Sequence, residues 1–179
     1  NGRQTGEFKH YYLNKTTKAI VNHRSGSDTS DAVYYHENGT KMAEGIYVKE
    51  LKESWWLFYD DRGELSSIEA YQAGKKNGKS QVLYLNQKLA REVIYKNDLE
   101  EGPFKEWFDD GKIKTEGVYL NGKLHGEIKY YYGNGVLKTS GAYSMGLREG
   151  SWVYYNTDGR ESARELYKYG KRKEQILSE

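Results

Sequence analysis

A tyrosine recurs at a constant interval along most of this chain. Six tyrosines follow one another at steps of 24 residues: Tyr47, Tyr71, Tyr95, Tyr119, Tyr143 and Tyr167. With this tyrosine placed at position 18 of each repeat, seven repeats start at Gly6, Ser30, Ser54, Gly78, Gly102, Gly126 and Gly150. A fixed period of this length is typical of proteins in which each repeat supplies one supersecondary element.

Two other columns of the repeat are rich in aromatic side chains. Position 3 holds Phe8, Ala32, Trp56, Ser80, Phe104, Ile128 and Trp152. Position 6 holds Tyr11, Tyr35, Tyr59, Leu83, Trp107, Tyr131 and Tyr155. Turn signals separate the columns, such as Asn134-Gly135 at positions 9 and 10 and Asn121-Gly122 at positions 20 and 21. Because Asn-Gly between aromatic-rich runs is a strong hairpin signal, we predict an all-β chain. The expected fold is an elongated solenoid of about seven 24-residue β-hairpin repeats forming one twisted antiparallel meander sheet.

The two turns also predict which residues face each other. If both turns are two-residue loops, position 3 pairs with position 16 of the same repeat, and position 16 also pairs with position 1 of the next. Phe104 and Ile128 would then lie opposite Gly117 and Gly141, where a bulky side chain supports the bare backbone of a glycine. The same pairing predicts a first face made of positions 1, 3, 5, 14, 16 and 18. It predicts a second face that includes positions 6, 17 and 19.

The composition favours a fold built on aromatic packing. The chain has a mean hydropathy of −0.97, yet 15% of its residues are aromatic, 18 of them are Tyr, and its net charge is +2. Disorder at such polarity usually needs a large net charge and few aromatics, so we expect the chain to fold. The absence of Cys excludes disulfide scaffolds, zinc ribbons and thiol nucleophiles. No apolar run approaches the roughly 18 residues of a membrane-spanning helix.

The ends of the repeat array are expected to differ from its middle. In the first repeat, Lys15 replaces the turn glycine and His23 replaces the column tyrosine. We therefore predict an irregular first repeat and N-terminal cap over residues 1–29, six hairpin repeats over residues 30–173, and a charged C-terminal tail over residues 174–179. Together these form a single structural domain. Because the chain starts with Asn1, targeting is not visible, and a secreted, periplasmic or outer-membrane-associated location is favoured over the cytoplasm.

The best-preserved repeats resemble a known family. Gly126 to Gly150 begins Gly-Glu-Ile-Lys-Tyr-Tyr-Tyr-Gly-Asn-Gly and ends Ser-Gly-Ala-Tyr-Ser-Met-Gly-Leu-Arg-Glu-Gly, and Gly117 to Gly126 reads Gly-Val-Tyr-Leu-Asn-Gly-Lys-Leu-His-Gly. This pattern is similar to the bacterial variant of the membrane occupation and recognition nexus (MORN) repeat. The resemblance implies an antitoxin-like protein, a protein scaffold or a membrane-lipid contact, three functions that the repeat itself does not distinguish.

Catalytic chemistry is not favoured by the sequence. The four histidines, at different repeat positions, are His10, His23, His36 and His125. They show no HxH or HExxH spacing, so surface or column-substituting roles are favoured over metal binding or base catalysis. The pairs Asp60-Asp61 and Asp109-Asp110 lie beside the first hairpin turn, where Asp is ordinary turn chemistry. We expect no enzyme activity, catalytic residue, metal site or cofactor.

Charge and aromatic patterns narrow the class of partner. The 28 basic and 26 acidic residues are mixed along the chain, which makes nucleic acid an unlikely ligand. One basic cluster, Lys168 with Lys171 to Lys173, is better explained as protection of the last edge strand than as a membrane patch. A ladder of Tyr and Trp could bind a glycan or lipid headgroup, or could be the core. We expect another protein as the partner, with a lipid headgroup or cell-envelope glycan as the alternative.

One aromatic residue does not follow the repeat. Trp55 stands at position 2, where the other repeats place Glu7, Asp31, Lys79, Pro103, Glu127 and Ser151. By strand alternation Leu57 shares the second face with Tyr59, and Tyr35 belongs to the same column as Tyr59. Since Trp and Tyr are typical hot-spot residues of protein interfaces, we predict that Trp55, Leu57, Tyr59 and Tyr35 form the partner-binding surface. The oligomeric state is left open.

Overall fold

The computed structural model describes residues 5–177, and the chain divides into two compact halves, Asn1–Gln87 and Lys88–Glu179. The N-terminal half contains β1 (Gly6–Tyr11), β2 (Thr17–His23), β3 (Thr29–Tyr35), β4 (Lys41–Val48), β5 (Leu51–Tyr59), β6 (Leu65–Gln72) and β7 (Lys75–Leu83). The C-terminal half contains β8 (Leu89–Lys96), β9 (Leu99–Trp107), β10 (Ile113–Leu120), β11 (Lys123–Leu124), β12 (Gly126–Tyr131), β13 (Leu137–Ser144), β14 (Leu147–Tyr155), β15 (Glu161–Lys168) and β16 (Lys171–Leu177).

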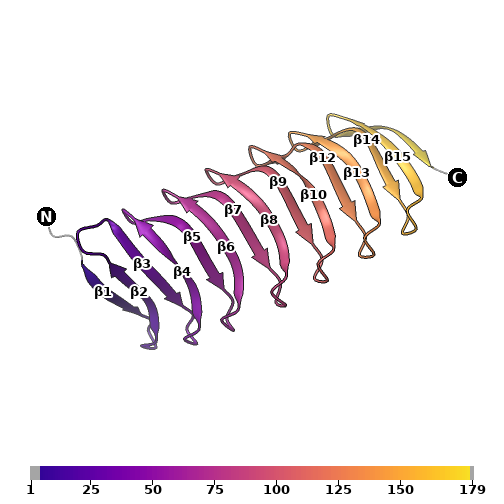
Figure 1. Cartoon of the computed structure of the whole chain (residues 1–179). Helices are drawn as coiled ribbons and strands as arrows, with labels where there is room; N and C mark the ends of the chain where they lie inside the picture. The colour runs from indigo at the N-terminus through magenta and orange to yellow at the C-terminus, as the bar shows by residue number, and fades with distance from the viewer. Residues whose placement is uncertain (1–4, 178–179) are drawn as a thin grey trace. The chain divides into compact units, whose positions relative to one another are not determined.

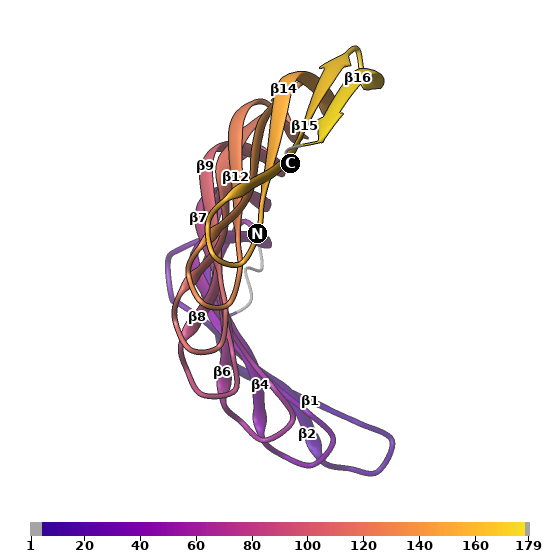
Figure 2. The ribbon, with the colours of Figure 1, turned by 90° about the vertical axis from the view of Figure 1, so that its right-hand side faces the viewer.

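Consecutive strands pair antiparallel within each half (Figure 1). The short β11 pairs with β10, and β12 continues the row beside β10. The prediction of an all-β meander of repeated hairpins is therefore confirmed within each half. Figure 2 shows β15 and β16 as the last hairpin, so residues 174–177 of the expected tail lie in a strand. Among residues 5–177, no helix is long and apolar enough to cross a membrane.

The two turns of the repeat have different geometries. At the second turn both central residues have positive φ, as at Asn121 (51°) and Gly122 (74°), which is the two-residue type I′ turn. At the first turn only the glycine does, as at Gly135 (88°), and Tyr132 N bonds to Val136 O at 2.8 Å. The prediction of two-residue loops at both turns is thus wrong for the first turn. That turn closes over three residues, and the register shift that follows it restores the predicted pairing.

The predicted pairing within a repeat is confirmed, because Phe104 pairs with Gly117 and Ile128 pairs with Gly141. The predicted pairing of position 16 with position 1 of the next repeat is wrong. Position 16 lies opposite position 3 of the next repeat instead, as in the pair Val93–Phe104. A bulge causes this shift, since position 1 takes positive φ, 85° at Gly102. Each position-16 residue therefore lies between two position-3 residues.

The first face is the packed face of both halves. Trp56 is 1% exposed and Trp152 is 0% exposed, and each lies over the position-16 glycine of the preceding repeat. A Cβ added at Gly45 would lie 2.3 Å from Trp56 Cδ2, and one added at Gly141 would lie 2.3 Å from Trp152 Cδ2. The glycines are required there because only a bare backbone leaves room for the indole. The column tyrosines then pack around these rings.

Hydrogen bonds 21 to 23 residues apart join successive repeats at both edges of the strands. At the second turn, Gly146 N donates to Leu124 O at 2.8 Å. At the first turn, the Tyr132 hydroxyl donates to Tyr155 O at 2.8 Å. These bonds between successive turns add to the strand pairing, so each repeat is stabilised in part by its neighbours.

Candidate functional site

Trp55 and Trp56 are adjacent on β5 but point to opposite faces. Trp56 is buried in the first face, whereas Trp55 is 47% exposed on the second face. Trp55 pairs with Ala70 on β6, and Leu57 pairs with Ile68 on β6 and with Glu44 on β4. The second face of β4 to β6 therefore carries a half-exposed indole beside partly buried aliphatic side chains. This is the composition of the centre of a protein interface.

An open hollow of about 800 Å³ lies beside Trp55. Its floor is made of small residues, since Ala70 faces Trp55 and Gly78 starts the next repeat with a φ of 112°. Its rim is polar and contains Glu53, Gln72, Asn77, Lys79 and Gln81. An apolar floor with one large aromatic wall and a polar rim can receive a side chain of a protein partner.

Tyr59 and Glu44 form the polar end of this surface. The Tyr59 hydroxyl donates to Glu44 Oε1, and Lys41 Nζ lies 2.9 Å from Glu44 Oε2 and 5.2 Å from the centre of the Tyr59 ring. The hydrogen bond from Tyr59, with the one from Lys41, lowers the pKa of Glu44, and burial raises the pKa of Tyr59 to about 12. The hydroxyl is thus held within the protein while part of the ring remains accessible to a partner.

The structure brings together three of the four residues predicted for partner binding. Trp55, Leu57 and Tyr59 lie along the second face of β5. Tyr35 lies on β3, separated from β5 by β4, and its carbonyl accepts a hydrogen bond from the Tyr12 hydroxyl at 2.7 Å. Of the four residues, Trp55 alone lines the hollow, Leu57 and Tyr59 continue the surface along β5, and Tyr35 lies two strands away. Binding at these positions remains a prediction.

Sequence reasoning missed the polar rim and the floor of the hollow. Gln72 and Lys79 stand in columns that mix polar and apolar residues, so the repeat gave no reason to select them. The available signal was the presence of Ala70 and Gly78 next to an off-column tryptophan. Small residues beside an exposed ring mark a place where the surface is hollowed.

The aromatic residues of the first face form a core rather than a binding platform. Beyond the buried indoles, basic side chains cover the rings: Lys52 Nζ lies 4.5 Å from the centre of the Trp56 ring, and the Arg148 guanidinium carbon lies 4.2 Å from that of Trp152. Burial lowers the pKa of Lys52. Such cation–π contacts use the ring faces that a sugar would otherwise stack on.

A carboxylate of the first face is strongly held. Glu165 stands at position 16, where three other repeats have Gly. It accepts hydrogen bonds from Tyr154 at 2.6 Å, Tyr167 at 2.9 Å and Arg172 at 2.8 Å. The bond from Tyr154, followed by that from Arg172, lowers the pKa of Glu165 from 4.5 to about 2. Its ionised form therefore stabilises the last repeats.

Glu165→Gln is expected to lower the free energy of unfolding by about 2 kcal/mol at pH 7, because charge-assisted hydrogen bonds are lost. Since the pKa is lower in the folded state, the stabilisation by Glu165 is complete above about pH 4.5 and is lost as the pH falls toward 2. Urea denaturation at several pH values should show that the free energy of unfolding of Glu165→Gln falls less steeply between about pH 4.5 and 2 than that of the wild type. Glu174→Gln, at an exposed position, is the control. The same acid dependence of the unfolding free energy in the wild type and in Glu165→Gln would contradict this role.

His36 and Asp60 have structural partners. His36 Nε2 lies 3.2 Å from Tyr59 O, and Asp60 Oδ1 accepts the Glu64 N–H at 2.9 Å within the first turn. His10 and His23 both line one hollow of the first face, a proximity that their sequence spacing did not predict. Over residues 5–177, no three His, Cys, Asp or Glu side chains come together as a possible metal site.

Comparison with known proteins identifies the repeat. A family model described as the MORN repeat variant matches residues 100–121 and 124–144. These residues cover β9 to β13 almost completely, and the match confirms the resemblance drawn from Gly117 to Gly150. A search of curated proteins finds no match to the chain.

Proposed function

Residues 100–121 and 124–144 are MORN repeat variants, and we propose that the chain is a non-catalytic module that binds a protein partner through the second face of β5 and β6. Repeats of this family generally act as binding or scaffolding modules. The observation that carries the proposal is the half-exposed Trp55 over the hollow floored by Ala70. A protein toxin, the partner that an antitoxin-like repeat would have, falls within this class.

The geometry favours a protein over a glycan or a membrane surface. The indoles at position 3 are buried, so a sugar cannot stack on them, and the rim of the hollow combines Glu53 with Lys79 and neutral amides. A rim of mixed charge offers hydrogen bonds to a polypeptide but little attraction to an anionic membrane.

Trp55→Ala is expected to change the free energy of unfolding by less than about 1 kcal/mol, because a half-exposed side chain loses little buried area. It should weaken partner binding about 30-fold, the effect of losing a hot-spot residue worth about 2 kcal/mol. A photo-crosslinking amino acid at position 55 of the whole chain, followed by mass spectrometry, identifies the partner. Calorimetric titration with that purified partner then measures the affinity.

Val82 is the matched control, since it is 42% exposed and pairs with Ser67 on the first face of the same half. Val82→Ala should leave the affinity unchanged, and a crosslinker at position 82 should give few protein adducts. Equal affinities for Trp55→Ala and the wild type would refute the proposal. So would saturable quenching of tryptophan fluorescence by anionic liposomes or by polysaccharide in the absence of any protein adduct at position 55.

A further inference from the structure

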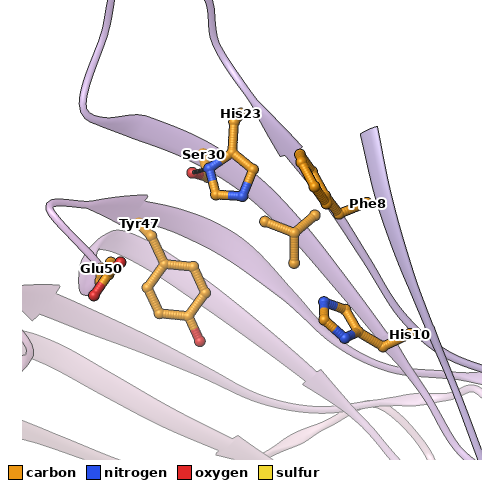
Figure 3. Close-up of a pocket in the computed structure, with 7 residues that line it drawn as sticks. Phe8, His10, His23, Ser30, Tyr47 and Glu50 are labelled. Carbon is orange, nitrogen blue, oxygen red and sulfur yellow. Dashed lines mark hydrogen bonds between the residues drawn. The ribbon is translucent and has the colours of Figure 1, made fainter. Parts of the chain in front are cut away.

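The first face of the N-terminal half contains a hollow of about 330 Å³ near β1 to β4. Figure 3 shows Phe8 and His10 on one side of it, Tyr47 and Glu50 on the other, and His23 with Ser30 at one end. The His23 and Phe8 rings meet edge to face at 5.3 Å, and His23 Nδ1 lies 2.8 Å from the Ser30 hydroxyl. These contacts hold the wall of the hollow in place.

This hollow corresponds to the space that a tryptophan fills one repeat later. Trp56 lies over Gly45, with the ring centres of Tyr47 and Tyr34 at 4.9 and 6.2 Å and Tyr71 packed against the same cluster. The residues 24 positions earlier are Val21, His23, His10 and Tyr47. All four of them line the hollow.

The hollow exists because of two substitutions in the repeat. The position equivalent to Trp56 is Ala32, which is too short to fill the space. The position equivalent to Gly45 is Val21, whose side chain forms an apolar floor and pairs with Phe8 on one side and Ala32 on the other. Since a single Cβ at Gly45 would already meet the Trp56 indole, Val21 and a tryptophan at position 32 could not coexist in the geometry of the next repeat.

We propose that this hollow is a binding site for a small planar aromatic molecule, which takes the place of the missing indole. The ring would lie on the Val21 side chain, between Phe8 and Tyr47, and therefore farther from the strand backbone than the Trp56 indole, which lies on the bare Gly45. Aromatic pairs of this kind stabilise a complex beyond the burial of their surface. His10, His23 and Ser30 provide nitrogen and oxygen atoms for an N–H or O–H group on the ring.

The volume and composition agree with this ligand class. A hollow of about 330 Å³ is at the small end of the range for ligand sites, roughly 300–1,000 Å³. Phe8, Tyr47 and the two imidazoles make its walls mainly aromatic, and the polar groups of His10, His23, Ser30 and Glu50 are distributed around it. The site lies on the opposite face from Trp55, so it is independent of the proposed protein-binding surface.

The test uses indole as the probe and the whole chain as the receptor. Saturation-transfer NMR with indole, and the shifts of the imidazole signals of His10 and His23 during titration, should show saturable binding. Cyclohexanol, which is not aromatic and is of similar size to a single ring, should bind at least tenfold more weakly. Absence of saturable indole binding, or equal binding of cyclohexanol, would overturn the proposal.

Two variants locate the site. Phe8→Ala should weaken indole binding at least tenfold, whereas Leu13→Ala, at a fully exposed position of the same half, should not. The double variant Val21→Gly/Ala32→Trp reproduces the Gly45–Trp56 pair, so it should fold and bind no indole. If Phe8→Ala binds indole as tightly as the wild type, the site is not where we place it, whether or not the double variant folds.

Discussion

Trp56→Ala is expected to lower the free energy of unfolding of the N-terminal half by about 3–5 kcal/mol, the usual cost of removing a buried Trp or Phe. Trp56 is 1% exposed, its Nε1 donates to Ile46 O at 3.1 Å, and its ring supports Lys52 and Tyr47. The alanine would leave a cavity and remove the hydrogen bond to the Ile46 carbonyl. Thermal and urea denaturation followed by circular dichroism measures the loss.

Trp55→Ala provides the matched control, because the same residue type is removed from the adjacent position. We expect a large loss of unfolding free energy for Trp56→Ala and a change below about 1 kcal/mol for Trp55→Ala. If the two variants were destabilised equally, the assignment of Trp55 to the second face and of Trp56 to the core would be wrong.

Gly141→Ala is expected to lower the free energy of unfolding of the C-terminal half by about 3 kcal/mol, at the upper end of the usual cost of overpacking a core. The new Cβ would lie 2.3 Å from Trp152 Cδ2, and Trp152 is completely buried, so the indole must move away from the cluster. Gly133→Ala is the control, since a Cβ there meets nothing within 4 Å. Chemical denaturation of both variants gives the comparison.

A double-mutant cycle separates the clash from any effect on the backbone. In a Trp152→Ala background the added methyl group of Gly141→Ala has no ring to meet, so it should cost much less than in the wild type. If Gly141→Ala costs the same with and without the indole, the glycine is required for another reason.

The sequence was sufficient to predict the strands, the core face and the pairing of position 3 with position 16. These follow from columns such as Trp56 and Trp152, because a ring that recurs at one position must occupy the same environment in each repeat. The bulge at position 1 could not be predicted, since Gly102 reads equally well as a turn, a bulge or a plain strand glycine. The loop of the first turn was missed because Asn-Gly occurs in both two-residue and three-residue hairpin loops.

The candidate sites were predictable only where a residue departs from its column. Trp55 is much larger than most residues of its column, and the sequence therefore identified it as a candidate. The hollow near Phe8 arises because Ala32 is smaller than Trp56 and Val21 is larger than Gly45 at the equivalent positions. The hollow could be recognised only after the register showed that Val21 and Ala32 face each other. In a repeat protein, a residue of unusual size at a packed position can therefore indicate a binding site, but only once the strand pairing is known.

The first face packs the fold, and we propose that the second face around Trp55 binds the partner. Hydroxyl-radical footprinting of the free chain and of its complex with the crosslinked partner tests both parts in one measurement. We expect Trp55 to be oxidised in the free chain and protected in the complex, while Trp56 remains unreactive in both. Oxidation of Trp55 at the same rate in the complex, or ready oxidation of Trp56 in the free chain, would contradict it.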